Sequence, residues 1–357
     1  MTQTTDAVGG LFYPITHVLG GALLGEERRD ALMRFEDLAL DGYAASTRDQ
    51  LSRVARDFSD FLRRTNYGPF PTVDAAIVDY VRDLARRGRK PASIETTLAY
   101  LSTLYRAAVH EADNPVRTKL VRLAVRGVKR QRGIAQKRAA PISADQLERL
   151  IAAAGDDLRG KRDRALVAVA WSALLRRSEV AALTLGDVVF EDDGSAAIRV
   201  RSSKTDVFGE GAIVPIDERA LSALLDYLAA MDCAAEDVGH DSRRPGVPLF
   251  RAISKSGRML ERGIASSSVQ YIYRRLAEKA GLPSDLVTEI TGHSMRRGAA
   301  SAILDAGVDP VDIRHLGRWA SESDMLARYA DARVTRRDAQ ASRRILRAKC
   351  AHDLNAI

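Results

Sequence analysis

The length, composition and charge of this chain favour a folded protein of two domains with a polyanionic partner. Its 357 residues exceed one ordinary core, and 46% apolar with 29% charged residues is a normal balance for a soluble, folded protein. Its two cysteines, Cys233 and Cys350, exclude a disulfide framework and a metal site built on cysteines, and they fit a reducing cytoplasm. The formal net charge of +8 at pH 7 indicates nucleic acid ahead of other partners.

The first 25 residues are predicted to form a flexible arm. Residues 7–25 contain no Lys, Arg, Asp or Glu, and the only charged side chain before them is Asp6. A signal peptide carries Lys or Arg at this place, and Pro14 with several glycines suits neither a signal core nor a membrane span. We therefore expect a cytoplasmic protein with no membrane partner.

Residues 26–132 carry apolar side chains at helical spacing throughout. Between residues 45 and 64, for example, Leu51, Val54 and Phe58 fall on one stripe. The expected helices cover residues 28–40 and 45–64, and the later ones open at Thr72, Ser93 and Pro115. This pattern predicts a compact all-helical domain of four or five helices.

A strongly basic run follows, and residues 133–141 within it are expected to link two domains. Between Pro115 and Pro141 there is no acidic residue, so the run contains no partner for its own cations. One interpretation is a solvated helix face and a linker. We favour contact with phosphates and steep salt dependence, because unneutralised charges would repel one another. The residues expected to contact DNA are Arg117, Lys119, Arg122, Arg126, Lys129, Arg130, Arg132, Lys137 and Arg138.

The second domain is predicted to span residues 142–332 and to mix helices with a small β-hairpin. Ser143 is expected to cap its first helix, with Gln146 completing a capping box. The hairpin pairs residues 196–201 with residues 212–216. The expected helices cover residues 144–154, 162–175, 177–185, 218–231, 266–280, 285–291, 294–306, 309–316 and 322–330. A last helix is expected at residues 335–348, within a C-terminal segment of residues 333–357.

One candidate site residue is Arg176, which lies between two apolar helical segments. An unpaired buried guanidinium is costly, so Arg176 must meet an anion. Glu179, one helical turn later, is a sufficient internal partner. Alternatively, Glu179 orients Arg176 while the remaining donors of its guanidinium face a phosphate.

A second pattern places a histidine and an arginine on one helix face. His293 and Arg296 are three residues apart, so their side chains can converge on one point. The small residues Gly298, Ala299 and Ala300 let that helix pack closely behind the site. Taken alone, a His and an Arg at this spacing are common.

A third pattern lies near the C-terminus, where Leu316-Gly317-Arg318-Trp319 precedes Tyr329. Tyr329 is the only tyrosine that follows His293. It is either a core tyrosine on a helix or a reactive phenol. Trp319 follows a Gly-Arg turn, where its indole N–H can donate to a ligand. Trp171, within an apolar helix, is expected to be plain core.

Together these patterns resemble the tyrosine recombinase, or phage integrase, family. An Arg-x-x-Glu after an apolar helix, a hairpin Lys, a His-x-x-Arg, a Leu-Gly-x-Trp and a nearby Tyr occur in the family's order. Residues 293–300, with Trp319 where many relatives have His, are most similar to the Cre-like branch. The spacing from Trp319 to Tyr329 is one residue longer than usual. The resemblance implies a mainly α fold, with a helical core-binding (SAM-like) domain and a mixed α/β catalytic domain that holds a small antiparallel sheet.

The resemblance also assigns roles at the scissile phosphate. Arg176 and Arg296 match the two arginines that bind it, and His293 and Trp319 match its further hydrogen-bond donors. Two guanidiniums offer planar, paired donors to the non-bridging oxygens. Glu179 matches the acidic residue that supports the site. No metal, ATP or other cofactor is implied.

The same resemblance assigns strand transfer to two further residues. Tyr329 matches the nucleophile, and Lys204 matches the hairpin lysine that protonates the leaving 5′-oxygen. A tyrosine hydroxyl has a pKa of roughly 10 and needs a nearby base or positive charge to attack at neutral pH. His293 can accept its proton.

The family's assembly implies partners as well. We expect double-stranded DNA with paired half-sites, four subunits on two duplexes, and no small-molecule substrate. Residues 333–357 are expected to dock on the next subunit, so a chain truncated after about Ala332 should bind DNA but not recombine it. The source would be a bacterial, phage or plasmid genome. Three alternatives stay open: a type IB topoisomerase, a metal-dependent transposase, and a non-catalytic DNA-binding protein with the same fold.

Overall fold

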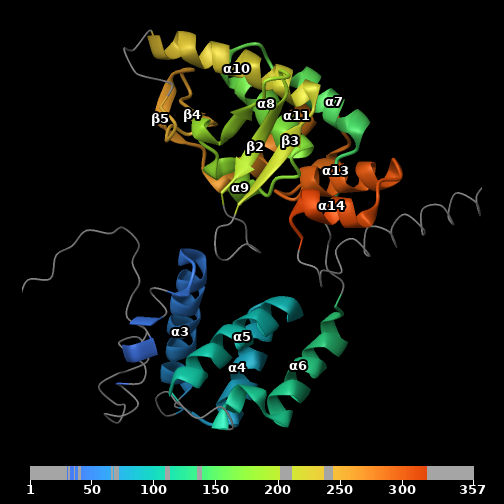
Figure 1. Cartoon of the computed structure of the whole chain (residues 1–357). Helices are drawn as coiled ribbons and strands as arrows, with labels where there is room; N and C mark the ends of the chain where they lie inside the picture. Colours follow the sequence, from blue (N-terminus) through green and yellow to red (C-terminus); the bar gives the residue numbers. More distant parts are fainter. Residues whose placement is uncertain are drawn as a thin grey trace, which may run out of the picture. The chain divides into compact units, whose positions relative to one another are not determined.

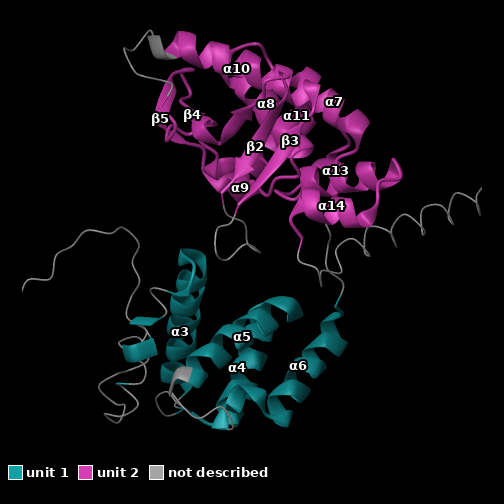
Figure 2. Ribbon diagram, viewed as in Figure 1, with its two compact units in different colours: residues 1–136 teal, residues 137–357 magenta. Residues whose placement is uncertain are grey.

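A computed structural model of the chain describes two compact units, residues 1–136 and residues 137–357 (Figure 2). The described residues are 30, 33–35, 37–38, 42–65, 67, 72–108, 113–134, 139–201, 211–236 and 244–319. The expected N-terminal arm, the hairpin turn with Lys204, the helices predicted at residues 322–330 and 335–348, and Tyr329 lie outside them. The division between the units falls within the segment expected to be a linker.

The first unit is helical (Figure 1). Its elements with described bounds are α3 (Ala45–Thr65), α4 (Asp74–Arg86), α5 (Pro91–Ala108), the 3₁₀ turn η3 (Pro115–Arg117) and α6 (Lys119–Arg132). Aromatic side chains fill the centre: the ring of Phe58 lies 5.0 Å from that of Tyr80 and 6.4 Å from that of Tyr105. All three side chains are fully buried, as the apolar stripe of α3 predicts.

Three helix starts in this unit differ from the sequence-based expectation. Thr72 does not cap α4: Val73 holds the N-cap position, and the Thr72 amide donates instead to the Tyr105 hydroxyl at 3.3 Å. The next helix, α5, begins at Pro91 rather than at Ser93, because proline suits the first turn of a helix. Pro115 opens only η3, and Thr118 caps α6.

The second unit wraps helices around one central helix. Its helices are α7 (Ala144–Ala153), α8 (Leu158–Ser172), α9 (Arg177–Ala182), η4 (Leu185–Asp187), α10 (Glu218–Glu236), α11 (Ser266–Lys279), α12 (Ser284–Glu289), α13 (Ser294–Asp305) and α14 (Pro310–Gly317). The central helix, α8, packs against α7, α10 and α13. It is apolar on every side from Ala165 to Trp171, so burial rather than an amphipathic stripe fixes its place. Trp171 is a core residue, as expected.

The predicted hairpin forms, as part of a three-stranded antiparallel sheet. Strands β2 (Ala196–Val200) and β3 (Ala212–Ile216) pair in the expected order, and β1 (Val188–Phe190) adds to β2. A second hairpin joins β4 (Arg251–Ile253) to β5 (Met259–Gly263). Strands β1, β4 and β5 were not predicted from the sequence, because strands of three to five residues are too short to show a period.

The starts of α7 and α8 can be compared with the sequence-based predictions. Ser143 and Gln146 form the predicted capping box at the start of α7. The central helix begins at Leu158, four residues before the expected start, with Asp157 as its cap. None of the described helices is long and apolar enough to cross a membrane.

Candidate active site

The site begins at a strained corner between α8 and α9. After the helix ends, Leu174 adopts a left-handed conformation with φ of +48°, which L-residues rarely adopt. This turns the chain sharply, so that Leu175 is buried and Arg176 becomes the N-cap residue of α9. Backbone strain of this kind concentrates at functional sites. The carbonyl of Leu174 is an acceptor in the network described next.

Both carboxylate oxygens of Glu179 accept hydrogen bonds from Arg176. The carboxylate accepts a hydrogen bond from Nη1 of Arg176 at 2.6 Å and one from the Arg176 main-chain amide at 2.9 Å. Glu179 is therefore an internal partner of Arg176, as one of the two interpretations predicts. These bonds do not use up the Arg176 guanidinium, because a guanidinium has five N–H donors.

The pKa of the Glu179 carboxyl is held below its usual value. Burial alone would raise this pKa, since a buried charge is poorly solvated. The positive charge of Arg318, and then the hydrogen bonds and charge of Arg176, outweigh burial. Glu179 therefore stays ionised at neutral pH, which lets it pair with both arginines.

Arg296 reaches the same place from the first turn of α13. Its side chain is buried, with 3% of the residue exposed, and donates to the carbonyl oxygens of Leu174 and Gly317. Its guanidinium carbon lies 4.4 Å from the centre of the Trp319 ring, which is the geometry of a cation–π contact. Trp319 therefore contacts a predicted site residue, but this contact does not test its predicted role as a hydrogen-bond donor to the phosphate.

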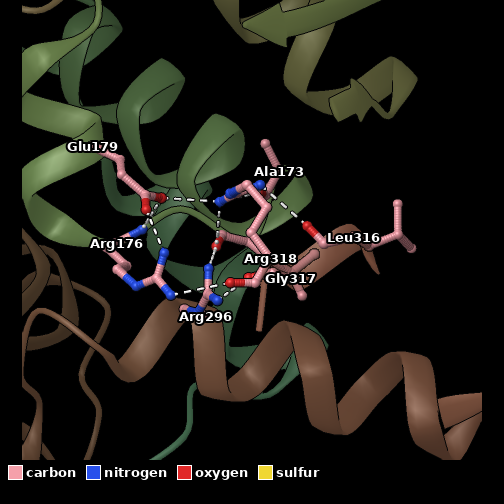
Figure 3. A network of polar contacts seen from close by, with 8 residues as sticks. Ala173, Arg176, Glu179, Arg296, Leu316, Gly317 and Arg318 are labelled. Carbon is pink, nitrogen blue, oxygen red and sulfur yellow. Dashed lines mark hydrogen bonds and ion pairs between the residues drawn. The ribbon is translucent and has the colours of Figure 1, made fainter. Parts of the chain in front are cut away.

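The two arginines converge on one turn of the chain (Figure 3). Nη2 of Arg176 donates to the carbonyl of Arg318 at 3.3 Å, while Arg296 donates to the carbonyl of Gly317. These carbonyls belong to successive residues at the end of α14. Two guanidiniums 120 residues apart in sequence thus each donate to one of two adjacent carbonyl oxygens, an arrangement suited to a bound oxyanion.

Close packing brings α13 to this position. A Cβ atom on Gly298 would overlap the Ile142 carbonyl and lie 2.5 Å from the ring of Trp171. Only glycine fits there, which confirms the expectation that small residues let this helix approach the core. Gly292, just before α13, is similarly close to the side chain of Arg177, since an added Cβ would lie 2.9 Å from its Cβ.

The structure places the other expected site residues as follows. His293 is exposed at the N-cap position of α13, three residues before Arg296, and its amide donates to the Thr291 hydroxyl at 3.2 Å. Lys204 and Tyr329 are outside the described residues. Among the residues that are described, no cluster of His, Cys, Asp and Glu has the arrangement of a metal site.

One member of this network, Arg318, was not predicted from the sequence. Its Nη2 donates to the Glu179 carboxylate at 2.9 Å and to the Leu174 carbonyl at 3.2 Å. The motif Leu-Gly-Arg-Trp was interpreted only as a turn that precedes Trp319. A second buried cluster was also missed: Asp163 pairs with Arg162 at 2.6 Å and with Arg275.

The basic run lies mostly on α6 of the first unit. Arg122, Arg126 and Arg130 recur every four residues, are exposed, and have no ion pair among the described residues. The absence of acidic partners does not hold for the whole run, because Lys129 pairs with Glu95 of α5 at 2.6 Å. Arg132 is also engaged, through a 2.6 Å bond to the carbonyl of Ala85.

The remaining residues of the basic run are either exposed or outside the described part of the chain. Arg117 and Lys119 are exposed, and Lys137 and Arg138 lie outside the described residues. A cavity of about 730 Å³ between α4 and α6 is lined by the apolar residues Leu120 and Leu123. The stripe of Arg122, Arg126 and Arg130 does not line this cavity, whose walls also include the charged residues Arg82, Arg86 and Arg132.

Comparison with known proteins identifies the family. The profile described as the phage integrase family matches residues 141–336, more than half of the chain. The integrase/recombinase XerD homologue of Selenomonas ruminantium is 28% identical over 280 residues, covering 77% of this chain and 78% of its own length. Recombinase Cre of Escherichia phage P1 is 26% identical over 311 residues, covering 83% and 86%.

Solved structures share the fold. The XerH site-specific recombinase bound to palindromic difH substrate matches with a TM-score of 0.61 at 14% identity, covering 93% of this chain and 95% of that one. A lambda integrase dimer bound to a COC′ core site matches with a TM-score of 0.52 at 20% identity, covering 85% and 77%. The predicted fold class, mainly α with small antiparallel sheets, is confirmed.

This chain belongs to the phage integrase family, the tyrosine recombinases. The resemblance inferred from its motifs is therefore confirmed, and the match to Cre is consistent with a place in the Cre-like branch. The family is one of recombinase enzymes that includes relatives named XerD and Cre.

Proposed function

We propose that this chain is a site-specific DNA recombinase that cleaves and rejoins strands through a phosphotyrosine at Tyr329. The observation that carries the proposal is the convergence of Arg176 and Arg296 on one turn, in a member of this family. In the proposal, the oxygens of the scissile phosphate take the place of the two turn carbonyls. No metal, ATP or other cofactor is required.

The two arginines stabilise the charge that develops during attack. A phosphodiester is anionic and repels nucleophiles, and attack concentrates negative charge on its non-bridging oxygens. Donors already fixed in place stabilise that charge without reorganisation, and losing one costs on the order of 3 kcal/mol in other enzymes. Glu179 fixes Arg176, and the Trp319 ring and the carbonyl of Leu174 fix Arg296.

The transfer itself is an exchange of phosphate esters. The Tyr329 oxygen bonds to phosphorus, the bond from phosphorus to the 5′-oxygen breaks, and a 3′-phosphotyrosine remains. His293 accepts the phenolic proton and Lys204 donates a proton to the departing 5′-oxygen. The ester keeps the energy of the broken bond, so a 5′-hydroxyl from the partner duplex can reverse the step and join the strands. One round of exchange gives a Holliday junction.

The proposed assembly is a tetramer on two duplexes with paired half-sites. The first unit and its basic stripe of Arg122, Arg126 and Arg130 bind the backbone of the DNA, and residues 333–357 dock on the next subunit. Solved structures with the same fold support this, since their descriptions include a lambda integrase tetramer bound to a Holliday junction and a Tn1549 integrase in complex with circular intermediate DNA. Both matches have TM-scores above 0.5.

Trapping the covalent complex tests this function. A library of duplexes with randomised arms and a nick beside the cleavage position is incubated with the protein, because the nick lets the short 5′-hydroxyl strand diffuse away and blocks rejoining. We expect wild type to form protein–DNA adducts that resist SDS, and Tyr329→Phe to form none. Sequencing the trapped DNA gives the target site.

Two results would overturn the proposal. One is the absence of any adduct with wild type, and the other is an adduct that persists in Tyr329→Phe. Arg164→Ala is the matched control, because Arg164 pairs with Asp156 and Asp226 in the same unit but outside this network. Relaxation of supercoiled plasmid that lacks the selected site would instead indicate a topoisomerase.

A further inference from the structure

Arg318 adopts a backbone conformation that is typical of glycine. It follows α14 with φ of +52° and ψ of +48°, the left-handed conformation that glycine usually adopts at the end of a helix. Among the described residues, Leu174 is the only other non-glycine residue with positive φ. Both residues lie in the same network, because the Leu174 carbonyl accepts a bond from Arg318 at 3.2 Å.

The side chain of Arg318 gives a reason for this conformation. Its guanidinium turns back into the protein, where Nη2 meets the Glu179 carboxylate at 2.9 Å and Nη1 meets the Leu316 carbonyl at 3.1 Å. Only 8% of the Arg318 side chain and 4% of the Glu179 side chain are exposed. A glycine would relieve the backbone but leave the buried carboxylate without this partner.

Arg318 is connected to Arg176 by two routes. Its main-chain carbonyl accepts Nη2 of Arg176 at 3.3 Å, and its side chain binds Oε2 of Glu179, whose Oε1 accepts Nη1 of Arg176 at 2.6 Å (Figure 3). The three residues therefore form a closed ring. Within it, the carboxylate cannot rotate without breaking one of two charged contacts.

We propose that Arg318 is a positioning residue for strand cleavage, which fixes the Glu179 carboxylate and through it the Arg176 guanidinium. The proposal rests on the function proposed above. Arg318 also connects the end of α14, which Trp319 follows, to the corner between α8 and α9. The turn contacted by Arg296 is thereby held in register with Arg176.

The charges around Glu179 show what the loss of Arg318 would do. Among the described residues, the charged groups that contact Glu179 are Arg176 and Arg318. Arg274 and Arg275 of α11, which packs against α9, bind instead to the Ile290 carbonyl and to Asp163. Without Arg318, only Arg176 of the two arginines that contact Glu179 remains to oppose its burial, so the pKa of its carboxyl rises.

The test measures single-turnover adduct formation on the duplexes selected with wild type. Arg318→Ala, Arg318→Gly and Arg318→Lys are compared with wild type and with Arg164→Ala, and each variant's DNA affinity and unfolding midpoint are measured. Arg318→Gly is the decisive variant, because it removes the side chain while allowing the left-handed backbone. It therefore separates the loss of positioning from a failure to fold.

We expect Arg318→Gly to slow cleavage by about 10- to 100-fold, since small misplacements of catalytic groups have effects of this size. DNA affinity should change by less than about 3-fold, because the binding surface is intact. The acid limb of the pH–rate profile should move to higher pH, and Arg318→Lys should recover part of the rate. Arg164→Ala should cleave at the wild-type rate.

Cleavage by Arg318→Gly at the wild-type rate would refute the positioning role. So would a loss of rate that only follows the loss of folded protein and leaves the acid limb in place. The absence of wild-type adduct in the same assay is a different result, since it would contradict the proposed function itself.

Discussion

Replacing Glu179 with glutamine should destabilise the unit of residues 137–357 by about 3 kcal/mol. The carboxylate lies between Nη1 of Arg176 at 2.6 Å and Nη2 of Arg318 at 2.9 Å, and 4% of its side chain is exposed. Removing one partner from a buried ion pair costs about 3–5 kcal/mol, because the remaining charge is left uncompensated. Glutamine keeps one acceptor oxygen, so we expect the lower end of this range.

Thermal unfolding followed by tryptophan fluorescence measures this change. Trp171 and Trp319 are the only two tryptophans in the chain, and both belong to the second unit, so the signal reports that unit alone. In a domain of this size each kcal/mol moves Tm by about 2–4 °C, so Tm should fall by roughly 6–12 °C. Glu148→Gln is the matched control, because Glu148 pairs with Arg219 at the surface and its loss should cost less than about 1 kcal/mol.

The pH dependence of this loss of stability tests whether the charge of Glu179 causes it. Because the pKa of the Glu179 carboxyl is lowered in the folded protein, its stabilising effect is fully present above the unfolded pKa of about 4.3. The effect is lost as the pH falls through the lower, folded value. The difference between wild type and Glu179→Gln should therefore be full at pH 7 and shrink in acid. A difference below about 1 kcal/mol at pH 7 would refute the reasoning.

The remaining predictions concern the second arginine, the packing of α13 and the basic face of α6. Arg296→Lys keeps a charge but loses the paired planar donors, so single-turnover adduct formation should slow by about 10²–10³-fold; a rate near wild type would contradict this. Gly298→Ala should cost about 1–3 kcal/mol in urea unfolding, because its Cβ would meet the backbone and an aromatic ring; an unchanged midpoint would contradict the packing. Replacing Arg122, Arg126 and Arg130 with Ala should reduce the slope of log K against log salt by about 2.7, and a retained slope would show that they do not bind phosphates.

Local patterns predicted much of the fold. The stripe of α3, the capping box of Ser143 and the hairpin of β2 and β3 are each encoded within a few neighbouring residues, and all three are confirmed. Elements that depend on distant partners were missed. Strand β1 is held by pairing with β2 rather than by a pattern of its own. Helix α8 was predicted, but its start was placed four residues too late.

The site was predictable only where its members belong to motifs. Arg176 with Glu179 and His293 with Arg296 are three residues apart, so each pair could be recognised as one turn of helix. Arg318 lies 139 residues from its carboxylate partner. No spacing rule connects residues at that separation. Its left-handed backbone was equally hidden, because arginine gives no sign of a conformation that glycine usually adopts.

The central claim is that Arg176 and Arg296 bind one phosphate, and replacing that phosphate with a methylphosphonate tests it most directly. The substitution removes the negative charge of the scissile group in the selected duplex. An arginine that stabilises this charge contributes less to the rate when the charge is absent. Arg176→Ala and Arg296→Ala should therefore each lose far less activity on the methylphosphonate than on the phosphate. Equal losses on both duplexes would contradict the account.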